Sequence, residues 1–204
     1  MSERGRFITL EGVDGAGKST HLQFVADAIA AKGRHVVQTR EPGGTDLAER
    51  IRKTVLEEPL SPTVETLLVF AARADHVAKV IVPALKAGSW VVCDRFTDAT
   101  IAYQGAGNGV APELIQRLAE VAHPGLKPDR TLVFDCPFEV ASRRLAGAGR
   151  PLDRFEREER AFFDRVRNAY LALAKAEPQR VRIIDATPEP AEVRKAIPQH
   201  LSDL

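Results

Sequence analysis

The stretch EGVDGAGKST, residues 11–20, decides the fold of this 204-residue chain. Its Gly12, Gly17, Lys18 and Ser19 match the phosphate-loop pattern G-x-x-x-x-G-K-[ST]. An apolar run typical of a strand comes directly before the loop, and a pattern typical of a helix follows it. In that context the backbone N–H groups of the loop and the N-terminus of the helix surround phosphates, so the stretch predicts nucleotide binding.

The chemistry of the loop gives several positions a role. Lys18 is expected to reach the β- and γ-phosphates of a nucleotide, and the Ser19 hydroxyl can bind Mg²⁺. Asp14 and Ala16 are unusual, because the first puts a negative charge where phosphates lie and the second offers no charge. One interpretation of Asp14 is that its side chain turns away to solvent. The predicted nucleotide-binding residues are Gly12, Val13, Asp14, Gly15, Ala16, Gly17, Lys18, Ser19 and Thr20.

The alternation of apolar runs and helical patterns predicts an α/β architecture. Strands are expected at residues 6–12, 35–39, 89–94, 130–136 and 181–186. Helical patterns occupy about 18–32, 47–56, 62–86, 112–121, a stretch from 137 and about 158–176, and a long polar loop is expected after Asp94, through Gly109. Such a pattern implies one domain, residues 1–204, with a parallel sheet covered on both faces. Ligands in these folds bind beyond the carboxyl ends of the strands.

The longest helical pattern carries its own start and stop signals. Ser61 suits the cap and Pro62 the first helical turn, while Gly88 follows the predicted end. An internal proline, Pro83, is expected to be able to kink the last turn.

Composition excludes several classes of protein. Hydrophobic residues make up 44% and charged residues 28%, as in an ordinary globular protein, and the net charge of +1 gives no footprint for nucleic acid or anionic membrane. No apolar run approaches the roughly 18 residues of a membrane span, and the charged N-terminus does not resemble a signal peptide. We therefore expect a cytoplasmic protein in which Cys93 and Cys136 are reduced, buried thiols.

The end of the third predicted strand, VVCDRF, favours phosphoryl transfer over hydrolysis. Asp94 can hold or orient Mg²⁺, directly or through water, so Ser19 and Asp94 are the candidate metal site. A motor ATPase usually ends this strand in consecutive acids, whereas Arg95 suits a second phosphate bound through two hydrogen bonds. A surface ion pair between the two residues is the alternative. The chain also lacks the Asn-Lys-x-Asp segment of a signalling GTPase.

Four further segments carry a resemblance to a known family. The segments are TREPGGT (39–45), LLVFAARADH (67–76), DRFTDATIAYQG (94–105) and PLDRFERE (151–158). Together with the phosphate loop, they resemble bacterial thymidylate kinases of the kind that carries arginines in the lid. These enzymes are P-loop nucleoside monophosphate kinases. The resemblance covers residues 7–185. It implies the three-layer P-loop kinase fold, a five-stranded parallel sheet flanked by helices, with a small mobile lid at about 143–158. It also implies ATP- and Mg²⁺-dependent phosphorylation of dTMP to dTDP, in dTTP biosynthesis, by a homodimer.

The resemblance extends to the acceptor site. Phe70 would stack on thymine and Arg73 would hydrogen-bond it, although core packing is the alternative for Phe70. Thr100 and Gln104 would offer hydrogen bonds to the base, and Tyr103 would lie against the sugar, where it would exclude a 2′-hydroxyl. The alternative is that these three are ordinary loop residues. Pro42 fixes the turn at Glu41–Pro42, and the sequence leaves its cis or trans state open. The implied substrate-binding residues are Glu41, Pro42, Phe70, Arg73, Arg95, Thr100, Tyr103 and Gln104.

The resemblance also addresses the two unusual loop residues. In the family the position of Asp14 faces the 3′-hydroxyl of the acceptor. Because Ala16 leaves the loop without the arginine that often compensates a migrating phosphoryl group, that arginine is expected in the lid. The candidate catalytic residues are thus Lys18, Arg95, Arg150, Arg154 and Asp14. Another nucleotide or deoxynucleoside kinase of the same fold, or a non-catalytic nucleotide switch, are the alternatives.

Overall fold

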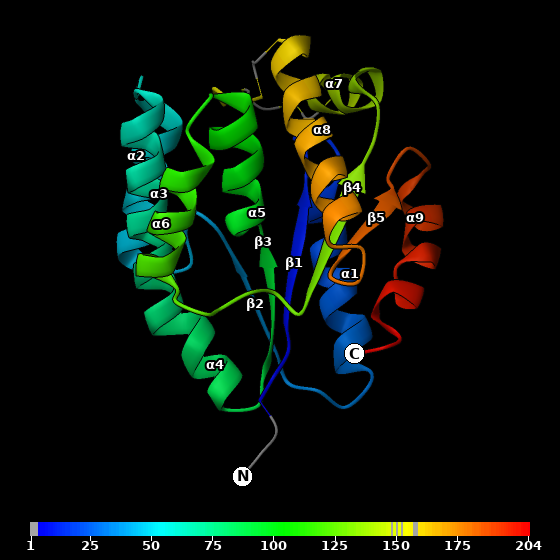
Figure 1. Cartoon of the computed structure of the whole chain (residues 1–204). Coiled ribbons are helices and arrows are strands. Elements are labelled where there is room, and N and C mark those ends of the chain that lie inside the picture. Colours follow the sequence, from blue (N-terminus) through cyan, green and yellow to red (C-terminus); the bar gives the residue numbers. More distant parts are fainter. Residues whose placement is uncertain (1–3, 148, 150, 152, 157–158) are drawn as a thin grey trace.

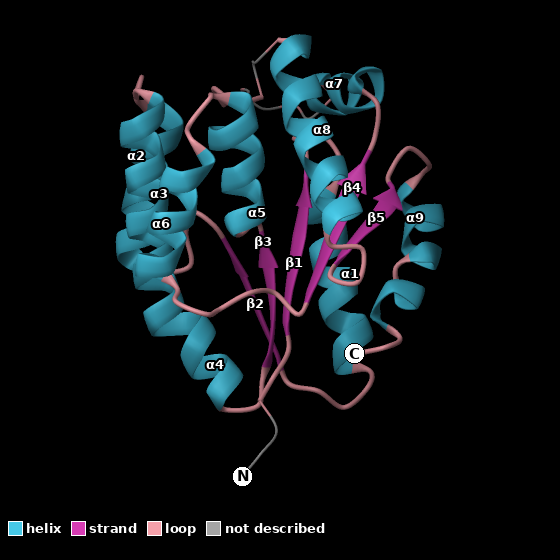
Figure 2. Ribbon diagram, viewed as in Figure 1, coloured by secondary structure: helices cyan, strands magenta, loops and turns pink. Residues whose placement is uncertain are grey.

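A computed structural model describes residues 4–147, 149, 151, 153–156 and 159–204. Its centre is a sheet of five strands, all parallel, in the order β2-β3-β1-β4-β5 (Figure 2). The predicted parallel sheet is confirmed, and the strands are β1 (Phe7–Gly12), β2 (Val36–Arg40), β3 (Trp90–Asp94), β4 (Arg130–Asp135) and β5 (Val181–Asp185).

Helices cover both faces of the sheet (Figure 1). Because strand side chains alternate between faces, Ile8 and Leu10 of β1 pack with Val25 and Ile29 of the first helix, whereas Phe7 packs into a separate cluster. The helices are α1 (Lys18–Ala30), α2 (Asp46–Glu57), α3 (Pro62–His76), α4 (Val82–Lys86), α5 (Thr97–Thr100), α6 (Pro112–Ala122), α7 (Phe138–Ala146), α8 (Arg160–Ala176) and α9 (Pro190–Ala196).

The predicted long helix begins where expected but is interrupted. The Ser61 hydroxyl accepts a hydrogen bond from the Val64 N–H at 3.4 Å, with Pro62 in the first turn. A π-helical segment, η1 (Val77–Ile81), then separates α3 from α4. Pro83 lies in the first turn of α4, where its missing N–H is tolerated, so the irregularity is a π segment that precedes the proline.

The loop predicted after Asp94 is wrong, because this segment is helical. It forms α5 and a π-helical segment, η2 (Ile101–Gly107). Gly107 permits close packing against α8, since a Cβ atom there would lie only 2.6 Å from Cε2 of Phe162. Burial of Ala102 and Tyr103 in this contact outweighs the low helix propensity of the glycines.

The C-terminal part of the chain adds elements that the sequence analysis did not anticipate. After β5, α9 and a 3₁₀ helix (Pro198–Leu201) bury Val193, Ile197 and Leu201 in the core. Cys93 and Cys136 are free and buried, as predicted. Across the described ranges no helix is both long and apolar enough to cross a membrane, and the cytoplasmic location stays a prediction.

The buried carboxyl group of Glu11 ties the end of β1 to its neighbours. One oxygen of Glu11 accepts the Phe96 N–H at 2.7 Å, and the other accepts the Tyr170 hydroxyl at 2.8 Å. Burial, reinforced by the negative charge of Asp98, raises the pKa of Glu11 from 4.5 to about 8, although Arg95 opposes the shift. The folded state therefore holds a proton on Glu11 at pH values where the unfolded chain has lost it.

Replacing this group should change how stability depends on pH. Because the folded pKa of Glu11 is raised, its contribution is fully present below pH 4.5 and is lost as the pH rises toward 8. The difference in unfolding free energy, Glu11→Gln minus wild type, should then grow by roughly 1.4 kcal/mol per pH unit inside this window. Urea unfolding at pH 5, 6.5 and 8 measures it. Glu139→Gln, at an exposed glutamate, is the control, and a flat Glu11→Gln difference would contradict the assignment.

Candidate active site

The phosphate loop connects β1 to α1 and winds around its lysine. Gly12 has φ 132°, and a Cβ atom there would lie 2.3 Å from the Phe134 carbonyl oxygen, so only glycine fits. The Lys18 ammonium donates to the carbonyl oxygens of Gly12 at 3.0 Å and Val13 at 2.9 Å. Burial and the nearby Arg95 lower the pKa of Lys18, and Asp14 opposes the shift. The loop thus holds a cation at the N-terminus of α1.

A cavity of about 600 Å³ lies outside this loop, and we call it the donor cavity. The predicted residues from Asp14 to Thr20 line it, whereas Gly12 and Val13 do not, because their carbonyls face Lys18. The opposite wall, which the sequence analysis missed, includes Arg144, Ala186, Pro188, Pro190 and Val193.

One side chain fixes that opposite wall. The Arg144 guanidinium of α7 donates to the carbonyl oxygens of Ala186 at 2.8 Å, Thr187 at 3.3 Å and Pro188 at 3.1 Å. Arg144 and this loop are far apart in the sequence and carry no motif, so only the packing of α7 beside the end of β5 brings them together.

Ser19 and Asp94 form an oxygen-rich pair at the edge of the donor cavity. The Ser19 hydroxyl donates to one carboxylate oxygen of Asp94 at 3.2 Å. The other oxygen of Asp94 is buried and has no partner in the part of the chain that the structure describes. A hydroxyl and a carboxylate are ligands that suit Mg²⁺, so these residues fit the predicted metal site.

A second, smaller cavity of about 90 Å³ lies beyond the end of β3, and we call it the acceptor cavity. Three aromatic rings line it, those of Phe96, Tyr103 and Phe155. Most of the predicted substrate-binding residues come together here: Glu41, Pro42, Arg73, Arg95, Thr100, Tyr103 and Gln104.

Phe70 is the exception among the predicted acceptor residues. It does not line the cavity but packs with Val110 and Ile115 in a cluster between α3 and α6. The Arg73 guanidinium carbon lies 4.7 Å from the centre of the Phe70 ring. Phe70 thus packs in the core, as the alternative interpretation expected, and its ring contacts the Arg73 guanidinium. Its stacking on a base stays a prediction.

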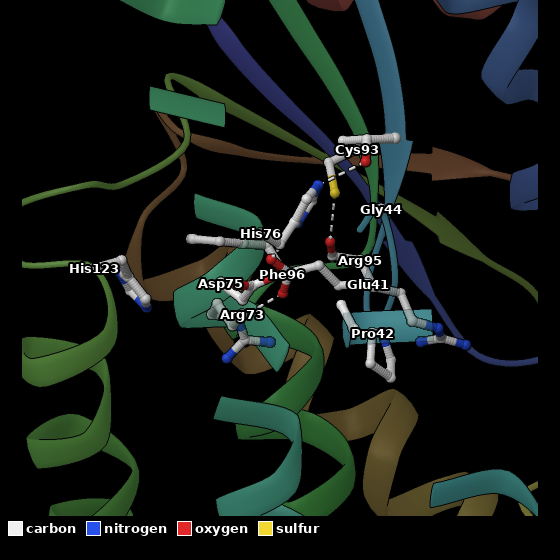
Figure 3. A network of polar contacts seen from close by, with 12 residues as sticks. Glu41, Pro42, Gly44, Arg73, Asp75, His76, Cys93, Arg95, Phe96 and His123 are labelled. Carbon is white, nitrogen blue, oxygen red and sulfur yellow. Dashed lines mark hydrogen bonds and ion pairs between the residues drawn. The ribbon is translucent and has the colours of Figure 1, made fainter. Parts of the chain in front are cut away.

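A buried ion pair orients Arg73 within the acceptor cavity (Figure 3). Arg73 Nε donates to Glu41 at 2.6 Å, and His76 Nδ1 lies 3.0 Å from the other Glu41 oxygen. Burial opposes ionisation of Glu41, but Arg73 and His76 outweigh it and lower its pKa. Arg73 Nη2 donates to Thr100 Oγ1 at 3.1 Å, while buried Nη1 lacks a partner among the described residues. The Glu41–Pro42 peptide is cis.

Asp14 faces the acceptor side of the loop. Arg95 donates to one of its oxygens at 2.5 Å, and the Tyr103 hydroxyl donates to the other at 2.8 Å. Burial opposes ionisation of Asp14, but the charges of Arg95 and Lys18 outweigh burial and lower its pKa. Asp14 therefore turns inward rather than to solvent, and its contact with an acceptor hydroxyl stays a prediction. Arg95 itself has φ 71°, a left-handed conformation that is uncommon outside glycine.

The two cavities meet at a shared set of charges. Asp14, Arg52, Arg95 and Asp153 line both of them. The sequence analysis missed Arg52 of α2, whose Nη1 donates to the Pro42 carbonyl oxygen at 3.0 Å. Burial, and then repulsion from Arg40 and Arg95, lower the pKa of Arg52. The sequence did contain a signal for Arg52. Arg52 follows Ala48 by four residues and precedes Val55 by three, so it lies on the same face of α2 as these buried residues, where a charged side chain needs a partner.

Arg154, one of the two arginines predicted to be catalytic, does not line the donor cavity. The Arg154 guanidinium forms an ion pair with Glu65 of α3 and donates from Nε to the Val55 carbonyl oxygen at 2.7 Å. Arg150 lies outside the described residues. The catalytic role predicted for each of them stays a prediction.

Comparison with known proteins agrees with this arrangement. A family model described as thymidylate kinase matches residues 10–197. The thymidylate kinase of Bordetella petrii is 56% identical over 204 residues, 100% of this chain and 98% of the relative. That of Cupriavidus necator is 55% identical over 193 residues, 94% of this chain and 95% of the relative. The crystal structure of thymidylate kinase from Ehrlichia chaffeensis is similar with a TM-score of 0.79 at 33% identity, covering 98% of this chain and 99% of that one. From its phosphate loop to α9, the chain belongs to the thymidylate kinase family.

Proposed function

We propose that this kinase transfers the γ-phosphoryl group of ATP to dTMP, which gives ADP and dTDP for dTTP synthesis. The observation that carries the proposal is the meeting of the donor and acceptor cavities at Asp14, Arg52, Arg95 and Asp153. A hydrolase needs one phosphate site and a water, whereas two cavities that share their cations suit transfer between two bound phosphates.

The reaction needs alignment and charge compensation rather than a strong base. The acceptor phosphate is already a nucleophile, so an oxygen of dTMP attacks the γ-phosphorus in line with the leaving oxygen of ADP. Lys18 holds the donor phosphates, while Arg95 and Arg52 hold the acceptor phosphate between the two cavities. These cations oppose the charge that develops on the transferred group.

The metal and the donor base have places at the same cavity. Ser19 and Asp94 would hold Mg²⁺, which neutralises phosphate charge and orients the donor when it is bound. The wall near Arg144 and Pro188, across from the phosphate loop, is where we place the adenosine part of ATP.

The acceptor cavity suits a pyrimidine deoxynucleotide. Arg73 offers a buried donor, Nη1, that has no partner among the described residues, and Thr100 and Gln104 line the same cavity. Tyr103 is held between Asp14 and Arg95, and we place the acceptor sugar beside it, where bulk at the 2′-position is disfavoured.

An acceptor panel with ATP and Mg²⁺ tests the proposal. dTMP should be the best substrate among dTMP, dUMP, dCMP, dAMP, dGMP and thymidine in a coupled ADP assay, with dTDP identified as product.

Replacing the lysine of the phosphate loop tests the donor site. Lys18→Ala should lower kcat about 100-fold or more while the circular dichroism spectrum is unchanged. Lys86→Ala, at an exposed lysine of α4, is the control. ATP hydrolysis without a phosphorylated acceptor, or faster turnover of another acceptor, would refute the proposal.

We also propose that residues 143–158 act as a lid that supplies the missing arginine, from Arg150 or Arg154. Asp153 and Phe155 of this segment line the acceptor cavity, which supports a position over the bound nucleotides. Closure would exclude water and suppress hydrolysis of ATP.

Replacing Arg154 separates a role in transfer from a role in the acceptor wall. If Arg154 compensates the migrating phosphoryl group, Arg154→Met should lower kcat by about 1000-fold and leave both KM values nearly unchanged. Steady-state kinetics with each substrate varied measure this. A rise in the KM for dTMP at normal kcat would instead limit Arg154 to its contact with Glu65.

A homodimer is the assembly we propose. Val64 and Leu67 of α3 are 44% and 47% exposed, and Val121 of α6 is 81% exposed, so two contacting helices present apolar side chains to solvent. Size-exclusion chromatography with light scattering should give twice the mass of the chain, and Leu67→Glu should shift the mass toward the monomer. A monomeric wild-type protein at micromolar concentration would contradict the proposal.

A further inference from the structure

Glu65 of α3 lies behind the acceptor cavity, where it touches Gln104 without lining the cavity itself. Its side chain is 1% exposed. Its Oε1 atom accepts from Gln104 Nε2 at 2.6 Å and from Asn108 Nδ2 at 3.4 Å. Its other oxygen pairs with Arg154. Both oxygens of this buried carboxylate are thus engaged by donors.

This contact decides which end of the Gln104 amide a ligand meets. An ionised carboxylate only accepts hydrogen bonds, whereas a glutamine amide has a donor NH₂ and an acceptor oxygen. If the amide were turned over, two acceptors would face one another in a buried place, at the cost of a lost hydrogen bond. Gln104 is 5% exposed and lines the acceptor cavity. Its Nε2 is held by Glu65, so its Oε1 is the atom left for a ligand.

Arg73 supplies the complementary group in the same cavity. Its Nη1 is buried without a partner among the described residues, and a guanidinium can only donate. The wall therefore offers a donor from Arg73 and an acceptor from Gln104. Thymine and uracil carry an acceptor at O4 and a donor at N3–H, whereas cytosine carries a donor at N4 and an acceptor at N3.

We infer that Glu65 is a positioning residue that makes the kinase select a 4-oxo pyrimidine, thymine or uracil, against cytosine, because it locks the Gln104 amide with its oxygen toward the base. The inference rests on the proposed function. Glu65 acts through Gln104 and does not contact the acceptor. The 5-methyl group is not read by this device, so selection between dTMP and dUMP is independent of it.

Glu65→Gln gives a directional test. In this variant, Arg154 would donate to the oxygen of the amide introduced at position 65, and the NH₂ of that amide would face Gln104. The Gln104 oxygen would then turn to accept from this NH₂. As a result, the NH₂ of Gln104 would point toward the base. The ratio of kcat/KM for dTMP to that for dCMP should fall at least about 10-fold, while the ratio for dTMP to dUMP should stay at the wild-type value. Glu120→Gln is the matched control, because exposed Glu120 of α6 also accepts from a glutamine amide, that of Gln116 at 3.3 Å. It should change neither ratio.

A swap of the two side chains tests the same orientation from the other side. In the double variant Glu65→Gln, Gln104→Glu, the amide introduced on α3 donates to the carboxylate introduced on η2. The second oxygen of that carboxylate can then accept from N3–H of the base. The double variant should restore most of the preference for dTMP over dCMP. If the single variant does not fold, the double variant alone tests whether the contact between positions 65 and 104 sets this preference.

The outcomes separate this inference from the proposed function. A folded Glu65→Gln variant that keeps the wild-type dTMP to dCMP ratio, or a folded swap that fails to restore it, overturns the inference alone. A fall in both base ratios together would overturn it too, since that indicates a general loss of the pocket. Wild-type protein that phosphorylates neither nucleotide would instead refute the proposed function.

Discussion

The ion pair between Asp14 and Arg95 is the contact on which the functional part of the structure depends. It joins the phosphate loop after β1 to the residue that follows β3, and the Tyr103 hydroxyl closes it from η2. The pair lies where the donor and acceptor cavities meet. An acidic residue inside a phosphate loop would otherwise repel the donor. Its charge is instead compensated by Arg95 at the junction of the two cavities, where we propose that Arg95 holds the phosphate of the acceptor.

Three buried glutamates hold the groups around this pair in place. Glu11 accepts the Phe96 N–H and the Tyr170 hydroxyl, Glu41 accepts Arg73, and Glu65 accepts Gln104. Buried carboxyl oxygens are costly unless donors satisfy them, so each contact strongly favours one arrangement of its partners. The acceptor cavity is thus preorganised by Glu41 in its wall and by Glu11 and Glu65, which do not line it. This arrangement explains how the short α5–η2 segment can present several polar side chains in defined directions.

Local patterns predicted the elements with strong periodicity and failed where tertiary packing decides. The phosphate loop, the strands and the start at Ser61 follow from spacing, glycine and capping chemistry. The segment after Asp94 does not, because its helical form depends on α8 packing against Gly107. Arg52 went unrecognised as a site residue, although an arginine on the buried stripe of α2 was a usable signal. Phe70 packs with Val110 and Ile115 and does not line the acceptor cavity. Helix spacing predicts which face of α3 a side chain lies on, but it does not predict whether that side chain reaches the cavity.

The sequence by itself determined the nucleotide-binding loop, the parallel sheet and the family, because these rest on short-range patterns that few other arrangements satisfy. Only the tertiary structure decided that Asp14 pairs with Arg95, that Arg52 belongs to both cavities, and that Glu65 orients Gln104. These contacts join residues from separate elements, and their partners depend on how helices pack over the carboxyl ends of the strands. The physical reason is that a buried charge takes the nearest available donor, and chain spacing does not say which donor is nearest.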